Sequence, residues 1–169
     1  MKSLAACVAA GLLLAAAGCR AQSATPPVAE LSLRELYRLP VGPRGLEPSP
    51  RLLALDGHDV RIAGYMAQQA DPLPGLFILS PLPVSLGDED ESYADDLPAA
   101  AVFVHLADGS AVVPPRPGRI ALSGRLEIGA RPETDGRISY VRLLLDAPTS
   151  RALIGAPALS LEKPDAASR

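Results

Sequence analysis

The chain has 169 residues and a formal net charge of −3, and 48% of its residues are hydrophobic. This length suits one domain with one modest core. Between residues 51 and 146 there are eight arginines, no lysine and fourteen acidic residues, which gives a formal charge of −6. A nucleic-acid backbone attracts the opposite sign, so this composition argues against a nucleic-acid-binding protein.

The first residues have the pattern of a bacterial export signal. Met1-Lys2 is followed by an apolar run, Leu4 to Ala17, which is too short to span a bilayer comfortably. Gly18 then precedes Cys19, as in a lipoprotein signal, where the thiol receives lipid and becomes the new N-terminus. We therefore expect residues 1–18 to be a lipoprotein signal peptide and Cys19 to be lipidated.

Ala16 departs from the leucine that is typical three residues before a lipidated cysteine. Cleavage by ordinary signal peptidase near residues 17–21 is the alternative, and it would give a soluble periplasmic protein with a free thiol. On the lipoprotein interpretation Cys7 leaves with the signal, so the mature chain forms no internal disulfide. Arg20, rather than aspartate, follows the lipidated residue, which favours the outer membrane over the inner membrane.

The next residues are expected to connect the lipid to a folded domain. Residues 19–30 lack periodicity and read as a flexible tether. Residues 31–50 are expected to hold a short helix and a Pro/Gly-rich irregular connector. Ser32 is placed as the N-cap and Glu35 completes a capping box, and Pro40 ends the helix by the residue before it.

The stretch L-D-G-H-D-V-R-I-A-G-Y-M at 55–66 organises the rest of the prediction. Asp56-Gly57 is typical of a tight turn, and from residue 60 apolar and polar side chains alternate as in a half-buried strand. Residues 120–128 repeat this pattern. Gly64 and Gly124 interrupt the two strands, and a glycine there indicates a bulge or a sharp bend.

Short strands with frequent turns and no long crossover helix predict an all-β, mainly antiparallel fold. We expect residues 51–148 to form a small five-stranded OB-like barrel, preceded by the short helix. Residues 149–169 are expected to add a short edge segment and a polar tail. The five expected strands cover residues 60–66, 76–79, 99–107, 120–128 and 137–146.

Three stretches resemble a known family. L-D-G-H-D-V-R-I-A-G-Y-M at 55–66, L-F-I-L-S-P at 76–81 and A-V-F-V at 101–104 are similar to motifs of DUF3299-like bacterial periplasmic proteins of unknown function. The resemblance covers roughly residues 52–146. It implies an OB-like barrel and an accessory role, often in transporter systems and metal handling.

The chain departs from that family where the family carries a Cys-His pair. The corresponding loop, residues 83–98, has Gly87, Asp88, Glu89 and Asp90 at those positions and contains no cysteine or histidine. The resemblance therefore transfers no metal or thiol role to this chain, which reads as a divergent member.

The remaining candidate metal ligands do not have the sequence spacing of known metal sites. A zinc site needs three or four convergent ligands, and His58 and His105 show no ligand spacing. The acidic loop at residues 88–96 offers oxygen ligands for a hard cation but lacks the spacing of an EF-hand. A solvated run of charge is its simpler interpretation, and we expect no metal or cofactor.

Enzyme chemistry also lacks a recognisable motif. No G-x-S-x-G is present, and Ser80, Ser85 and Ser92 have no partner visible in the sequence. The carboxylates from Asp88 to Glu91 stand in polar surroundings that do not perturb pKa values. We therefore expect no catalytic residues.

Three aromatic residues are candidates for binding on outer sheet faces: Tyr65, Phe103 and Tyr140. Ordinary packing is the alternative for each. Together these features predict a non-enzymatic envelope lipoprotein, attached to the membrane by its N-terminal lipid, that serves an envelope protein complex as an accessory or binding module. The alternative is a periplasmic metal or small-ligand binder that uses the acidic loop 88–96.

Overall fold

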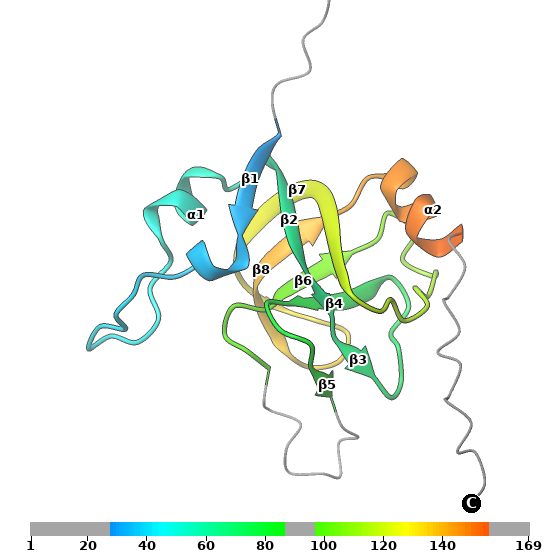
Figure 1. Cartoon of the computed structure of the whole chain (residues 1–169), viewed down its shortest axis with the longest axis horizontal. Coiled ribbons are helices and arrows are strands. Elements are labelled where there is room, and N and C mark those ends of the chain that lie inside the picture. Colours follow the sequence, from blue (N-terminus) through cyan, green and yellow to red (C-terminus); the bar gives the residue numbers. More distant parts are fainter. Residues whose placement is uncertain (1–27, 87–96, 156–169) are drawn as a thin grey trace, which may run out of the picture.

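The computed structural model describes residues 28–86 and 97–155 (Figure 1). The predicted signal peptide, Cys19 and the acidic loop residues 87–96 lie outside them. The elements in chain order are β1 (Ala29–Ser32), the 3-10 helix η1 (Leu33–Glu35), α1 (Pro50–Ala54), β2 (Asp59–Met66), β3 (Gln68–Gln69), β4 (Leu76–Ser80), β5 (Ser85–Leu86), β6 (Val102–His105), β7 (Arg119–Pro132), β8 (Ile138–Leu144) and α2 (Ala147–Gly155).

The described strands form one mixed six-stranded sheet in the order β1-β2-β4-β6-β8-β7, and β2 also pairs with β7. The small strands β3 and β5 make a second, parallel pair. The expectation of a mainly antiparallel sheet was only partly right, because β1 pairs with β2, and β6 with β8, in parallel. Parallel strands need a long connection between them. Here the connection between β6 and β8 contains the strand β7, which takes the place of a crossover helix.

Strand β2 shares its two edges among three neighbours. One edge pairs with β7 from Asp59 to Tyr65, while the other pairs first with β1 and then, beyond Gly64, with β4. A Cβ on Gly64 would lie 2.7 Å from both the Leu33 side chain and the Ser80 carbonyl oxygen. Glycine is required here because Leu33 and the backbone of β4 approach too closely for a side chain, whereas the sequence predicted a bulge or a sharp bend at this position.

Strand β7 changes partner in its middle. It pairs with β2 up to Arg125 and with β8 from Arg125 onward. A Cβ on Gly124 would lie 2.4 Å from the carbonyl oxygen of Leu144. The register irregularity expected near Gly124 falls instead between Ile128 and Arg131.

The predicted turn before β2 is present, with Gly57 at a φ of +72°. Its aspartate side chain contacts a residue far along the chain. The Asp56 carboxylate accepts the Ile128 N–H at 3.0 Å, and the Gly57 N–H donates to the Leu126 carbonyl at 2.8 Å. The turn therefore binds β7 just beyond its pairing with β2.

The predicted alternation along β2 and β7 places their apolar side chains in the main core. Val60, Ile62 and Met66 of β2 are buried, as are Leu122 and Leu126 of β7. They belong to the main core, which the other strands, η1 and α1 complete. A second, smaller cluster covers the opposite face of β4 and β6, where β5 closes over it; its buried members are Ala67, Leu76, Ile78, Leu86, Ala101 and Phe103.

The N-terminal region is more ordered than predicted. Strand β1 begins at Ala29, inside the expected tether, and the Ser32 side chain accepts the Arg34 N–H as an N-cap. The helix after it is a single 3-10 turn. Residues 36–49, expected to finish the helix and then form an irregular connector, form a paired arm that projects from the sheet (Figure 1), with bridges Tyr37 to Pro48 and Gly42 to Gly45.

Two helices were not predicted. In α1, Pro50 occupies the first turn and Ser49 is the N-cap, accepting the Leu52 N–H at 3.0 Å. Residues 147–155 form α2 rather than an edge segment, because the Asp146 carboxylate caps it through the Thr149 N–H at 2.7 Å. Proline in a first helical turn loses no hydrogen bond, so prolines here begin helices instead of ending strands. No helix among the described residues is long and apolar enough to cross a membrane.

We predict that Gly124→Ala destabilises the protein by about 1–3 kcal/mol or more, because the new methyl group would overlap the Leu144 carbonyl. Gly42→Ala is the control, since a Cβ there meets nothing within 4 Å and its φ is not positive. Urea unfolding of both variants measures the difference. Equal stability of the two would contradict the close approach of β7 to β8.

Candidate functional site

An apolar groove of about 540 Å³ lies between the arm and the last two strands of the sheet. This volume is in the range of small-molecule and side-chain pockets. The arm and α1 form one wall and the β7–β8 ribbon forms the other. Its lining residues are Tyr37, Leu46, Pro48, Leu52, Ala99, Ile128, Gly129, Tyr140 and Val141.

Apolar side chains remain exposed around this groove and along the arm. Tyr140 is 59% exposed and Leu46 is 43% exposed, although both line the groove. Leu39 and Val41, farther along the arm, are exposed to 76% and 54%. Exposed apolar side chains that gather at a groove are typical of an interaction surface.

Two tyrosines give the groove its polar groups. Burial raises the pKa of the Tyr37 phenol above its usual 10.0, and the charge of an ionised Tyr140 raises it further. The Tyr37 hydroxyl therefore stays neutral across physiological pH. A neutral phenol on an apolar wall presents both a flat hydrophobic ring and one hydrogen-bonding group.

A buried arginine, Arg142, contacts Gly129, which lines the groove. The guanidinium of Arg142, only 5% exposed, donates to the Gly129 carbonyl at 2.7 Å and to the Ser139 hydroxyl at 3.0 Å. Its Nε also lies 3.4 Å from the Glu127 carboxylate. These contacts hold the irregular part of β7, where Gly129 has a φ of +127°, against β8.

A second polar cluster contains one of the predicted histidines. The Glu133 side chain is 5% exposed; its Oε2 lies 3.3 Å from His105 Nε2, and its other oxygen accepts the Ser139 hydroxyl. The geometry at His105 Nε2 does not make a well-directed hydrogen bond, so we describe this pair as a close contact. A carboxylate between a serine and a histidine differs from a catalytic triad, in which the histidine takes the middle place.

The structure does not bring the two histidines together. His58 lies in the turn before β2 with an exposed side chain, whereas His105 ends β6 beside Glu133. Within residues 28–86 and 97–155, no three His, Cys, Asp or Glu side chains gather as metal ligands. The acidic loop 88–96 lies outside these residues.

The predicted serines have structural contacts. Ser80 is fully buried, and its hydroxyl accepts the Leu82 N–H at 3.4 Å. Ser85 donates to the Gln68 side chain at 3.3 Å, joining β5 to β3. Ser92 lies in the part of the chain that is not described.

The three candidate aromatics have different positions. Phe103 is buried in the smaller apolar cluster, and Tyr65 is half-buried on β2 opposite Ser80 and Arg119. Tyr140 alone of the three lines the groove. The sequence analysis did not identify Tyr37 or the rest of the arm as a candidate site. A signal was present, because apolar residues within a Pro/Gly-rich segment indicate a loop that exposes apolar side chains.

The chain matches no protein-family model and no curated protein. Among solved structures it is similar to the crystal structure of a DUF3299 family protein from Pseudomonas aeruginosa PAO1, at 13% sequence identity and a TM-score of 0.44. The match covers 69% of this chain and 91% of that one.

We predict that Tyr37 ionises above pH 10 and that Tyr140→Phe lowers its pKa only partway, because burial is the larger cause. A pKa that is raised in the folded state means that the unfolded chain loses its proton first. The stability linked to Tyr37 is therefore complete below pH 10 and is lost as pH rises through the folded pKa. NMR titration of ring-labelled tyrosine measures both effects, with Tyr37→Phe to assign the signal. An ordinary pKa for Tyr37 would contradict the burial of its hydroxyl.

Proposed function

We propose that this chain is an exported, non-enzymatic binding module, attached to the outer membrane by lipid on Cys19, that binds an apolar segment of an envelope protein. The groove between the arm and the β7–β8 ribbon is the observation that carries the proposal. The module acts as an accessory part of a periplasmic or transporter-associated complex. Its ligand is a protein segment rather than a substrate to be converted.

The character of the groove supports a protein ligand. Its base is formed by buried aliphatic side chains such as Leu52 and Val141, and its walls carry two tyrosines. Beyond it lies a charged rim, in which Glu47 pairs with Arg38 at 3.8 Å and with Arg44 at 2.9 Å. An apolar centre with tyrosines and a polar rim is the usual composition of a protein interface.

The fold that we infer for this module is a small OB-like barrel, as the resemblance to the DUF3299 family implies. The pairings support closure, since β2, β4, β6, β8 and β7 follow one another and β7 pairs again with β2. The glycines where β2 and β7 change partner support it as well, because closed sheets need sharply bent strands.

A binding role fits the chemistry of the described polar groups better than catalysis does. Ser139 is fully buried and hydrogen-bonds to Glu133 and Arg142, and Ser80 is fully buried at the end of β4. The exposed groove instead offers flat apolar surface and a neutral phenol. These groups recognise a ligand without activating one.

The anchor is tested by labelling growing cells with radioactive palmitate. We expect label in the wild-type chain and complete loss of label in Cys19→Ala, since the thiol is the only lipid acceptor proposed. Cys7→Ala is the matched control and should keep its label. Label that persists in Cys19→Ala would refute the anchor.

The groove is tested by placing a photo-crosslinking amino acid at Leu46 in cells. We expect one protein adduct of defined mass, and Tyr140→Ala should weaken it about tenfold, in line with the loss of a large aromatic contact at an interface centre. The same crosslinker at Arg151, exposed on α2, is the control position. An equal adduct from Arg151, or an adduct insensitive to Tyr140→Ala, would contradict binding in the groove.

A further inference from the structure

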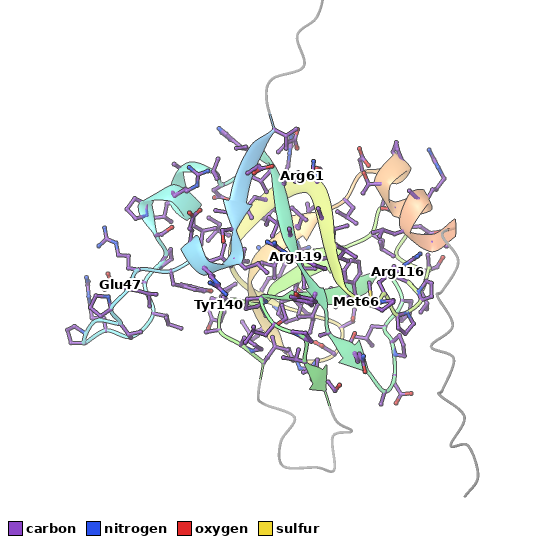
Figure 2. All side chains as sticks on the ribbon, in the orientation of Figure 1. Glu47, Arg61, Met66, Arg116, Arg119 and Tyr140 are labelled. Atoms are coloured by element: carbon purple, nitrogen blue, oxygen red, sulfur yellow. The ribbon has the colours of Figure 1, made fainter. Side chains whose placement is uncertain are left out.

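Two exposed arginines lie on one face of the sheet, outside the groove just described. Arg61 of β2 and Arg119 of β7 both point outward, because Arg61, Ala63 and Tyr65 alternate with buried residues and Arg119 is paired with Tyr65. Figure 2 shows the two arginines one above the other along these strands. Neither forms an ion pair with another described residue.

Between the two arginines the surface is hollowed to about 340 Å³. The small side chains of Ser32 and Ala63 line it, and Arg61 and Arg119 stand on either side. Each arginine is two residues from the level of Ala63, which is about 7 Å along a strand. An arginine side chain is long enough to cover that distance. Both guanidinium groups could therefore contact one small anion placed above the hollow.

Some of the other charged groups at the hollow already form contacts with each other. Arg51 lies 3.4 Å from the Glu35 carboxylate and also donates to the Glu30 carbonyl. The Glu30 side chain is adjacent to Arg61 in the β1–β2 register, but no ion pair joins them within 4 Å. Two arginines against one carboxylate leave an excess of positive charge, although the chain as a whole carries −3.

The hollow is also close to the point where the chain would leave the membrane. Strand β1, which forms one wall, begins at Ala29, ten residues after Cys19. Ten extended residues span at most about 36 Å. A lipid on Cys19 would therefore keep this face within a few nanometres of phosphate-bearing headgroups at all times.

We propose that the outer face of β1, β2 and β7 rests on the membrane surface and binds headgroup phosphates of anionic lipids through Arg61 and Arg119. The membrane location rests on the proposed anchor, whereas the affinity for anionic headgroups does not. Guanidinium groups bind phosphate through two parallel hydrogen bonds, which a shallow hollow with small walls leaves room to form.

The test uses residues 20–169, which lack the lipid but keep every described residue. Sedimentation with vesicles of phosphatidylcholine alone, or with phosphatidylglycerol added, measures binding. We expect binding only to the anionic vesicles, about fivefold weaker in Arg61→Gln and in Arg119→Gln. Glu30→Gln should bind more tightly, because it removes the opposing charge. Added salt should weaken the interaction.

Arg151→Gln is the matched control, since it removes one exposed positive charge from α2. We expect its binding to change less than twofold. An equal loss in this variant, or no binding to anionic vesicles, would overturn the proposal. So would binding of inorganic phosphate at Arg61 and Arg119 without binding of vesicles. Any of these results would leave the labelling of Cys19 and the adduct at Leu46 unaffected, so the two proposals fail separately.

Discussion

The direct pairing of β2 with β7 is the constraint on which the rest of the structure depends. It requires two places where backbones come so close that no Cβ fits, Gly64 and Gly124. At the first, β2 exchanges β1 for β4 as its neighbour, and at the second β7 passes from β2 to β8. A strand that changes neighbours must bend, and the missing side chains allow the bend. Burial of alternate residues on both strands then supplies the stabilisation, because these residues belong to the main apolar core.

The same bend creates the groove. Once β7 has left β2, its far half pairs only with β8, and its register slips between Ile128 and Arg131. Arg142 stabilises that irregular segment by donating to the Gly129 carbonyl, which would otherwise lack a partner in the ladder. The segment therefore stays open toward the arm instead of packing flat. A buried guanidinium carries a high desolvation cost, and here hydrogen bonds to Gly129 and Ser139, together with the Glu127 carboxylate, offset it.

The sequence predicted the parts of the fold that follow from local periodicity. Residues 60–66 and 120–128 alternate so regularly that both strands and their buried faces were identified, and the two interrupting glycines were recognised as significant. The parallel pairing of β6 with β8 could not be predicted, since it depends on which strands meet after β7 has bent. An edge segment was expected where α2 lies, because the sequence there has no marked helical pattern; the helix depends on its cap, in which the Asp146 carboxylate accepts the Thr149 N–H. The groove was missed because the arm has no alternation of apolar and polar residues, and its form comes from bridges between its own two halves, Tyr37 to Pro48 and Gly42 to Gly45.

The two proposed binding surfaces share one structural element, α1. Arg51 faces the arginine-lined hollow and the adjacent Leu52 closes the base of the apolar groove, so successive residues of one short helix contribute to both. Helix α1 has only five residues and depends on its cap at Ser49 and on the burial of Leu52. Such a helix is not stable alone, and its position is set by the arm before it and the core beneath it. If the arginine face rests on the membrane, α1 lies at the boundary between lipid and solvent. The groove, whose base includes the next residue of α1, would then open beside the membrane surface.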